Sequence, residues 1–394
     1  MKGKLLQFVK YTRIIYTLYF YLGSWTLSLL KLLIHSDKHT IIFSSFGGKK
    51  FDDSPKCIYD AILKDNRFNG YRLIWAFQEP DKYTLPRGTK VKIDTFNYFK
   101  TLLKAGIWIT NSSLTRGLYI KGTDTFSINT WHGTPIKHMG SDTEGTKSFR
   151  IKKSVQDNVK LCQSHYELDI FSRVFNTPKE IFHLTGLPRN DELSLPHSEE
   201  WKNTIKEKLG IKAEKKVILY APTFRDYEKN AVGTITACPP IQFDKWKEAL
   251  GDRYVLLVRM HYEVTKIMDV PCNGFSFNVS NYPNLNELIL ISDMLISDYS
   301  SIFFDYSITG KPMLCFAYDY EKYSTLRGMY FDIRKELDME HCCNTEEQII
   351  AEIQHIDMDK KSYITKRFRD KYVEAYGTAT RQTLNIIADH ICIK

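Results

Sequence analysis

The sequence lacks the features of several protein classes. Among its 394 residues there is no CxxC pair, no low-complexity tract and no internal repeat. The eight cysteines are scattered, and Cys162 and Cys315 lie in apolar runs that are typical of buried strands. This scatter favours a reducing compartment over a disulfide framework. The length suits two domains, and a hydrophobic content of 43% is sufficient for two large cores.

Acidic residues are absent from the first 36 positions, which carry five lysines and arginines. The uncharged run at 14–30 is slightly short for a membrane-spanning helix and is diluted by Ser, Thr and Gly. No small-residue cleavage site follows it, and its aromatic content is high for a signal peptide. We therefore predict that residues 1–36 form a helical segment in a membrane interface, with basic side chains on anionic lipid. A helix packed on the following domain is the alternative.

Patterns of nucleic-acid binding and of metal binding are also missing. The formal net charge is +9, yet the sequence has no recognition-helix pattern, zinc spacing or RNA-binding aromatic motif. The charge fits work at an anionic surface, and we predict no nucleic-acid partner. The DxD sequence at Asp357–Asp359 falls in a polar helical region and is interpreted as solvated surface. We accordingly predict neither a metal ion nor another cofactor.

Strand-like and helix-like segments alternate along the chain. Apolar strands are predicted at 39–45, 71–77, 107–110, 159–162, 217–221, 254–258, 294–297 and 313–316. The alternation implies parallel sheets built from βαβ units. The polar, charged stretch at 190–200 interrupts it and is the best linker. We predict an α/β fold with two Rossmann-like domains, at 37–190 and 191–394, which face a central cleft and follow the membrane-associating helix at 1–36.

The stretch from Leu295 to Asp305 has the pattern of a buried strand, a sharp turn and the first turn of a helix. Asp298 and Ser300 are suitable N-cap residues, and Ser300 and Ser301 place two hydroxyl groups beside the free N–H groups of a helix start. Such an end attracts anions, here a phosphate or pyrophosphate. An ordinary capped helix without a ligand is the alternative.

Other apolar strands also end in polar residues. His132 follows the strand that ends near Trp131, Arg259 and His261 end a second strand, and Thr223 ends a third. Ligands of open α/β sheets bind outside the carboxyl ends of the strands, so these side chains are candidate site residues. A single histidine is more often structural, but two histidines at strand ends favour a site.

Five blocks of sequence resemble signature blocks of the CDP-glycerol glycerophosphotransferase family. They are WHGTPIK at 131–137, TGLPRND at 185–191, LYAPTFRD at 219–226, RMHY at 259–262 and SDYSSIFFDY at 297–306. They occur in the order of that family, between FSSFGGKKFDDSPK at 43–56 and RGMYFD at 327–332. The resemblance covers roughly residues 41–335.

The resemblance implies the GT-B arrangement, with the acceptor on the domain at 37–190 and a CDP-polyol on the domain at 191–394. The implied donor-binding residues are His132, Gly133, Thr134, Pro135, Ile136, Arg189, Pro222, Thr223, Arg259, Met260, His261, Ser300, Ser301 and Asp305. His132 is our choice for the general base, because imidazole has a near-neutral pKa, and His261 with Arg259 is our choice for the phosphate clamp. Which histidine has which role stays open.

The implied function is transfer of glycerol phosphate from CDP-glycerol to a hydroxyl of a lipid-linked acceptor, with release of CMP, in teichoic acid or capsular polymer synthesis. The expected acceptor is an undecaprenyl-diphosphate-linked saccharide or polyol phosphate. The expected location is the cytoplasmic face of the bacterial cell membrane. Three alternatives stay open: CDP-ribitol as donor, a GT-B glycosyltransferase that uses a nucleotide sugar, and a non-catalytic scaffold of the wall-polymer machinery.

Overall fold

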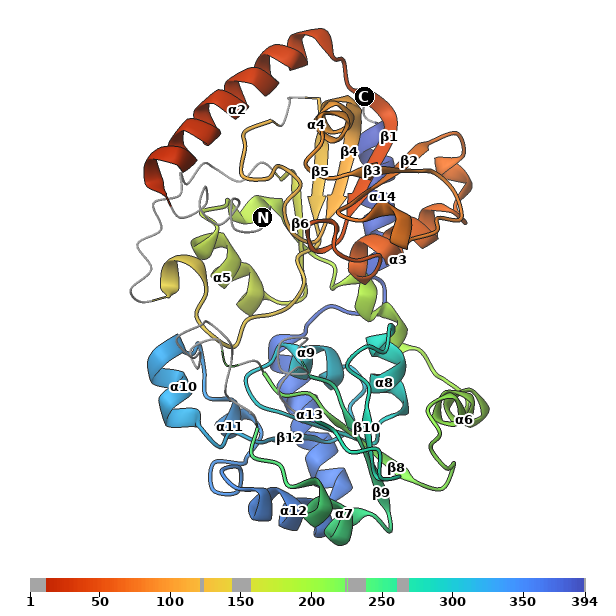
Figure 1. The fold of residues 1–394 in the computed structure, drawn as a ribbon, viewed down its shortest axis with the longest axis vertical. Coiled ribbons are helices and arrows are strands. Elements are labelled where there is room, and N and C mark those ends of the chain that lie inside the picture. Colours follow the sequence, from red (N-terminus) through yellow and green to blue (C-terminus); the bar gives the residue numbers. More distant parts are fainter. Residues whose placement is uncertain are drawn as a thin grey trace. The chain divides into compact units, whose positions relative to one another are not determined.

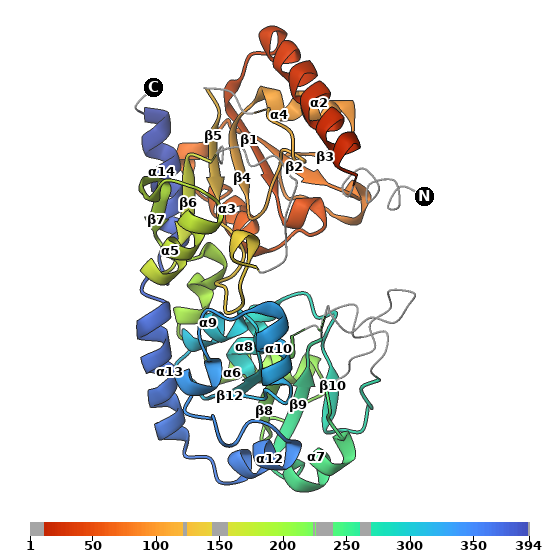
Figure 2. The same cartoon turned by 90° about the vertical axis from the view of Figure 1, so that its left-hand side faces the viewer.

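The computed structural model describes residues 12–120, 124–143, 157–223, 225, 239–260 and 269–392 (Figures 1 and 2). Its contacts divide the chain into two compact units. Unit 1 comprises Met1–His132, Gly145–Asp191 and Thr378–Lys394, and unit 2 comprises Gly133–Glu144 and Glu192–Gly377. The predicted central cleft concerns the placement of the two units and stays a prediction.

Unit 1 contains a seven-stranded sheet in which all paired strands are parallel. The strands are β1 (Asp37–Ser44), β2 (Arg72–Phe77), β3 (Thr89–Lys92), β4 (Ala105–Thr110), β5 (Phe126–Asn129), β6 (Val159–Cys162) and β7 (Phe182–Leu184). Their order is β3-β2-β1-β4-β5-β6-β7. The order reverses between β1 and β4, so the loops after these two strands flank a topological switch point.

Helices cover both faces of this sheet. The α-helices of unit 1 are α2 (Arg13–Leu33), α3 (Asp53–Ile62), α4 (Phe96–Lys104), α5 (His165–Val174) and α14 (Ala379–Cys392). Short 3-10 turns are η1 (Phe46–Gly48), η2 (Asn66–Phe68), η3 (Pro80–Lys82), η5 (Lys179–Ile181) and η6 (Pro188–Ser194), of which the last crosses the boundary at 191/192.

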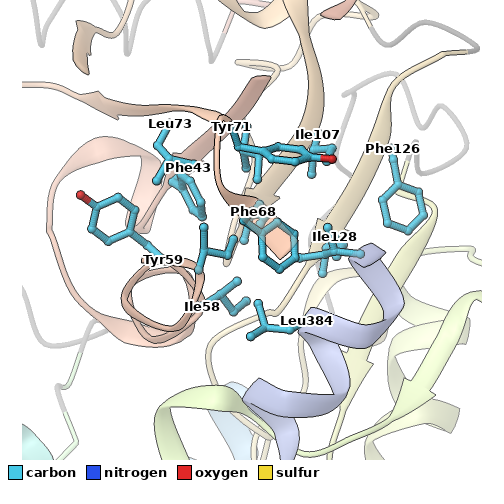
Figure 3. Packing of buried hydrophobic residues seen from close by; sticks show 14 of the residues in the cluster. Phe43, Ile58, Tyr59, Phe68, Tyr71, Leu73, Ile107, Phe126, Ile128 and Leu384 are labelled. Atoms are coloured by element: carbon cyan, nitrogen blue, oxygen red, sulfur yellow. The ribbon is translucent and has the colours of Figure 1, made fainter. Parts of the chain in front are cut away.

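Successive side chains of the central strands enter different cores, as the two-residue period of a strand requires. Ile41 and Phe43 pack in a cluster with residues of α3 and α14, whereas Ile42 packs in a second cluster with residues of α4 and α2. Figure 3 shows part of the first cluster, in which Leu384 of α14 lies close to Ile58 of α3. Apolar residues on both strand faces explain why these strands read as continuous apolar runs.

Unit 2 contains a five-stranded parallel sheet. Its strands are β8 (Lys216–Tyr220), β9 (Tyr254–Val258), β10 (Ser276–Asn278), β11 (Met294–Ser297) and β12 (Met313–Cys315). Their order is β10-β9-β8-β11-β12, with a switch point between β8 and β11. The helices are α6 (Glu199–Lys208), α7 (Phe243–Leu250), α8 (Leu285–Ile291), α9 (Ile302–Ser307), α10 (Tyr320–Arg327), α11 (Ile333–Glu336), α12 (Glu346–Gln354) and α13 (Met358–Tyr372), with the turn η4 (Gly140–Asp142).

The α/β fold with parallel sheets is confirmed, and so are the eight strands predicted from apolar runs, within one or two residues at their ends. Strands β3, β7 and β10 were missed, because each has only three or four residues and carries Lys, His, Ser, Thr or Asn in place of a continuous apolar run. The DxD sequence has a local role, since the exposed Asp357 carboxylate accepts a hydrogen bond from the Lys360 N–H and caps α13.

The C-terminal helix differs from the predicted domain boundaries. The prediction assigned every residue after 191 to one domain, whereas Thr378–Lys394 belongs to unit 1. The reason is packing, because Leu384 and Ile387 complete the core under α3. The Asp191 carboxylate also accepts hydrogen bonds from the N–H groups at the start of α14.

The N-terminal helix α2 packs on unit 1. Phe20 and Leu27 are buried, and the Cδ2 atom of Leu118 comes within 2.9 Å of the Cβ position of Gly23. The Ser24 hydroxyl accepts a hydrogen bond from the Tyr119 N–H. No helix in the described part of the chain is both long enough and apolar enough to cross a membrane. The prediction that residues 1–36 lie in a membrane interface did not require a spanning helix, and it stays a prediction.

Ile387→Ala should lower the free energy of unfolding of unit 1 by about 2–5 kcal/mol, because Ile387 is fully buried and its loss leaves a cavity between α14 and the sheet. Urea unfolding followed by hydrogen exchange of β1 amides measures the effect. Asp389→Ala, on an exposed position of the same helix, is the control. Equal protection in both variants would contradict the assignment of α14 to this core.

Candidate functional site

The His132 side chain has a defined orientation in unit 1. It follows β5, and the Nδ1 atom of its ring lies 2.7 Å from the carbonyl oxygen of Asn111. A carbonyl oxygen only accepts hydrogen bonds, so Nδ1 carries the proton and donates it to Asn111. In the neutral ring this leaves the lone pair of Nε2 as the only acceptor.

The ring lies at the switch point of the first sheet. Asn111 follows β4, and Phe46, whose ring centre is 5.5 Å from that of His132, follows β1. The backbone of Trp131 is in the left-handed region, with φ of 51°, which is uncommon for a bulky residue. This turn directs His132 toward the loops after β1 and β4, where ligands of such sheets bind.

Burial sets the protonation state of His132. It lowers the pKa of the imidazole, because desolvation disfavours the charged form, and Arg189 lowers it further. The Asn111 carbonyl and the Asp53 carboxylate act in the opposite direction without reversing the shift. His132 is therefore neutral at pH 7 and has the protonation state of a base.

Two loops meet at the switch point of the second sheet, and Asp298 joins them. Its Oδ1 atom accepts hydrogen bonds from the N–H groups of Thr223 (2.8 Å), after β8, and Tyr299 (2.6 Å), after β11. The hydroxyl oxygen of Thr223 is buried and has no hydrogen-bond partner within the described ranges. An unpaired buried hydroxyl is costly, which points to a polar ligand at this loop.

A buried guanidinium holds the same loops. Arg225 donates to Asp298 at 2.9 Å and binds both carboxylate oxygens of Asp319, at 2.8 and 2.9 Å. Burial alone would lower the pKa of Arg225, but the charges of Asp298 and Asp319 outweigh it and raise that pKa. The Tyr299 hydroxyl also donates to Asp319. The loops after β8 and β11 are thus fixed to one another by charge as well as by backbone hydrogen bonds.

The turn before α9 differs from the predicted cap. Ser301 occupies the N-cap position but makes no side-chain cap hydrogen bond, and the Ser300 hydroxyl accepts from the Ile302 N–H at 3.3 Å. Asp298 binds the loop after β8 instead of capping the helix. A Cβ atom on Gly133, whose φ is 154°, would lie 2.8 Å from the Ser301 hydroxyl oxygen, so only glycine allows this close approach.

The RGMYFD block, which the sequence left without a role, pairs with the WHGTPIK block inside unit 2. The Tyr330 N–H donates to the Ile136 carbonyl, and the His138 N–H donates to the Gly328 carbonyl. Between them, the backbones of Lys137 and Met329 form an isolated antiparallel β-bridge. Thr134, Pro135 and Ile136 are buried. The residues that follow His132 are therefore held by a second, distant motif.

Four further predicted residues have different outcomes. Arg259 and Met260 follow β9, and Nη1 of Arg259 donates to the backbone carbonyls of Val279 and Tyr282. Asp305 is buried in α9. His261 lies outside the described residues, so its role as phosphate clamp stays a prediction. Of the predicted residues, the structure brings together His132 with Arg189 in unit 1 and Gly133 with Ser301 in unit 2.

The sequence analysis did not assign a role to Asn111, Asp53, Arg225 or Asp319. Asp53 and Arg225 stand inside blocks that carry the family resemblance, which was the available signal. Asn111 contributes a backbone carbonyl, and Asp319 lies 94 positions from its partner Arg225. Neither contact produces a pattern of neighbouring residues that could be recognised in the sequence. Within the described residues, no group of three or more His, Cys, Asp and Glu side chains could hold a metal ion.

Two parallel sheets with polar residues beside their switch points define an α/β protein of Rossmann type. A sequence profile of the CDP-Glycerol:Poly(glycerophosphate) glycerophosphotransferase family matches residues 26–388. The chain belongs to this family, and the resemblance seen in its motifs is confirmed.

Relatives and solved structures agree with this assignment. The chain is 38% identical over 312 residues to a teichoic acid poly(glycerol phosphate) polymerase of Staphylococcus epidermidis, covering 76% of this chain but only 43% of the relative. It is 33% identical over 345 residues to a teichoic acid glycerol-phosphate transferase of Staphylococcus aureus, covering 84% of this chain and 87% of the relative. A histidine variant of the wall teichoic acid polymerase TagF is similar in structure, with a TM-score of 0.82, 31% identity, and coverage of 94% and 98%. Another TagF structure was soaked with CDPG.

Arg225→Met should lower the local stability of β8 and β11 by about 3–5 kcal/mol, because it leaves the buried carboxylate of Asp298 and the part-buried carboxylate of Asp319 without their partner. Hydrogen exchange of peptides from these strands measures the loss. Arg367→Met removes the exposed pair with Asp338 and should cost no more than about 1 kcal/mol. A similar, small effect of both substitutions would show that the buried network does not fix the loops.

Proposed function

We propose that this protein transfers glycerol phosphate from CDP-glycerol to a hydroxyl of a lipid-linked acceptor and releases CMP, in teichoic acid or capsular polymer synthesis. The observation that carries the proposal is His132, a neutral imidazole whose Nδ1 is occupied by Asn111 and whose Nε2 is left to accept a proton. Family membership and the glycerol-phosphate relatives support the choice of donor.

The reaction follows from these groups. An acceptor hydroxyl oxygen attacks the phosphorus that bears glycerol, and its proton passes to Nε2 of His132. The bond between that phosphorus and the bridging oxygen breaks, and the oxygen leaves with CMP. A phosphodiester forms, and the negative charge on the leaving phosphate is stabilised by cations and oriented N–H groups.

The donor-binding set proposed from the family resemblance has structural support at several positions. The Thr223 hydroxyl is buried without a described partner, and the Ser301 hydroxyl makes no cap hydrogen bond. Gly133 lies against Ser301 inside unit 2. Arg259 and His261 complete the proposed phosphate clamp.

His132→Ala should reduce turnover of CDP-glycerol by about 100- to 10,000-fold, the usual loss for a general base, while donor affinity changes little. CMP release measures the rate, and calorimetry measures donor binding. In the unchanged protein, kcat/KM should begin to fall only below the ordinary pKa range of histidine, because burial lowers the pKa of His132.

His183→Ala is the matched control, since His183 is a part-buried histidine of β7 outside the proposed site. It should keep the turnover of the unchanged protein. An His132→Ala variant that keeps more than a tenth of the rate would exclude His132 as the base. Turnover of CDP-ribitol or of a nucleotide sugar in place of CDP-glycerol would identify an alternative donor.

We also propose that α2 holds the protein at an anionic membrane surface, on the cytoplasmic side where cytidine nucleotides are made. One side of the helix packs on unit 1, while the opposite side exposes large apolar side chains along its full length. These are Ile14, Leu18, Tyr21, Leu22, Trp25, Leu29, Leu32 and Leu33. Such a stripe, with basic residues and no acids in the first 36 positions, suits an interfacial helix near a lipid-linked acceptor.

Replacing Leu18, Leu22 and Trp25 together by Gln should weaken binding to anionic vesicles by about 10- to 1,000-fold, because each apolar side chain loses part of roughly 1.5–3 kcal/mol of transfer free energy. The three residues are 55–64% exposed, so the fold should be unaffected. Deleting the whole helix is a poorer test, because Phe20 and Leu27 belong to the core.

Replacing Leu195, Leu326 and Tyr363 by Gln removes three exposed apolar side chains from unit 2 and serves as the control. Vesicle sedimentation at two salt concentrations measures both triple variants, since salt screens only the contribution of the basic residues. Equal loss of binding in both would show that α2 is not the membrane contact.

A further inference from the structure

The carboxylate of Asp53 lies at the start of α3, and its side chain is only 7% exposed. Its Oδ2 atom is 2.8 Å from Nη1 of Arg189, and its Oδ1 atom accepts a hydrogen bond from the Ser54 N–H. Its backbone has φ of 62°, a left-handed conformation that Asp tolerates better than most residues but that still costs free energy. Such strain in a buried acid suggests that its place matters for the residues around it.

The same nitrogen of Arg189 reaches His132. Nη1 donates to the His132 carbonyl oxygen at 2.9 Å, and the Arg189 N–H donates to the Ser54 hydroxyl. Asp53, Arg189 and the backbone of His132 therefore form one continuous chain of hydrogen bonds. This chain fixes the His132 carbonyl oxygen, directly after the turn at Trp131. The Asn111 carbonyl fixes the imidazole ring of the same residue.

Among the described residues, three groups shift the pKa of His132 beside its burial. Charge comes from Asp53 at the start of α3 and from Arg189 in η6, and the Asn111 carbonyl acts from the end of β4. The aromatic rings of Phe46 and Trp131 also lie beside the imidazole ring. Without Asp53, the guanidinium would face the imidazole with no balancing charge on this side.

We propose that Asp53 is a positioning residue for His132: through Arg189 it holds the backbone of the base in place, and its charge balances the guanidinium beside the imidazole. The proposal rests on the function proposed for His132. It adds a residue that touches no reacting atom and that works through a partner 136 positions away in the chain.

Asp53→Asn is the sharpest substitution, because asparagine keeps the shape and tolerates the left-handed backbone while removing the charge. Turnover of CDP-glycerol should fall about 10- to 100-fold through misplacement of the base, with little change in KM for the donor. Loss of the negative charge disfavours the imidazolium, so the acid limb of the pH–rate profile should move to lower pH.

Asp94→Asn provides a close control. Asp94 also has a left-handed backbone, with φ of 64°, and also pairs with an arginine, Arg116, at 2.7 Å. It is not among the groups that act on His132. This variant should keep the turnover and the pH profile of the unchanged protein. If Asp53→Asn behaves like Asp94→Asn in both measurements, the proposal is wrong.

A titration of His132 by NMR separates this proposal from the proposed function, because it needs no activity. The pKa of His132 should be lower in Asp53→Asn than in the unchanged protein, and unchanged in Asp94→Asn. Arg189→Lys is a second variant in case Asp53→Asn does not fold. Lysine keeps the positive charge but has a single nitrogen in place of the planar guanidinium, which has several N–H donors. This variant should lower turnover by a similar factor without moving the acid limb, and an unchanged rate would overturn the positioning role.

Discussion

The hydrogen bond from Nδ1 of His132 to the carbonyl oxygen of Asn111 is the interaction on which the proposed chemistry depends. It fixes the tautomer, because the carbonyl can only accept, and so it leaves Nε2 as the proton acceptor. Asn111 can serve in this way because β4 lies next to β5 and ends beside it. The orientation of the base is therefore a consequence of strand order, with burial supplying the neutral state.

The two sheets share the same strand order at their switch points but position different groups there. Each has its first strand next to its fourth, and each places polar groups after both of these strands. In unit 1 the groups are few and hold one imidazole. In unit 2 a buried guanidinium and two carboxylates fix the loops. Within the described residues the Thr223 hydroxyl has no hydrogen-bond partner, and the Ser301 hydroxyl does not cap α9. Rigid loops with unsatisfied donors are suited to hold a phosphorylated ligand.

Local pattern was sufficient to predict the longer apolar strands, the parallel sheets and the position of His132, because continuous apolar runs and the turn residues after them are local features. The membership of α14 in unit 1 could not be read in this way, since it depends on how Leu384 and Ile387 fit a core made by residues more than 200 positions earlier. The same limit applies to Asp53, whose partner Arg189 is distant in sequence. For α2, the composition predicted a helix with apolar residues, but the division into a packed side and an exposed side needed the structure.

In the proposed reaction, this protein moves glycerol phosphate as one unit. Mass spectrometry of a defined lipid-linked acceptor, incubated with the protein and CDP-glycerol, tests it directly. The acceptor should gain whole glycerol phosphate units through a phosphodiester, with one CMP released for each unit. Transfer of glycerol without phosphate, or an unchanged acceptor under conditions in which calorimetry shows the donor bound, would contradict it.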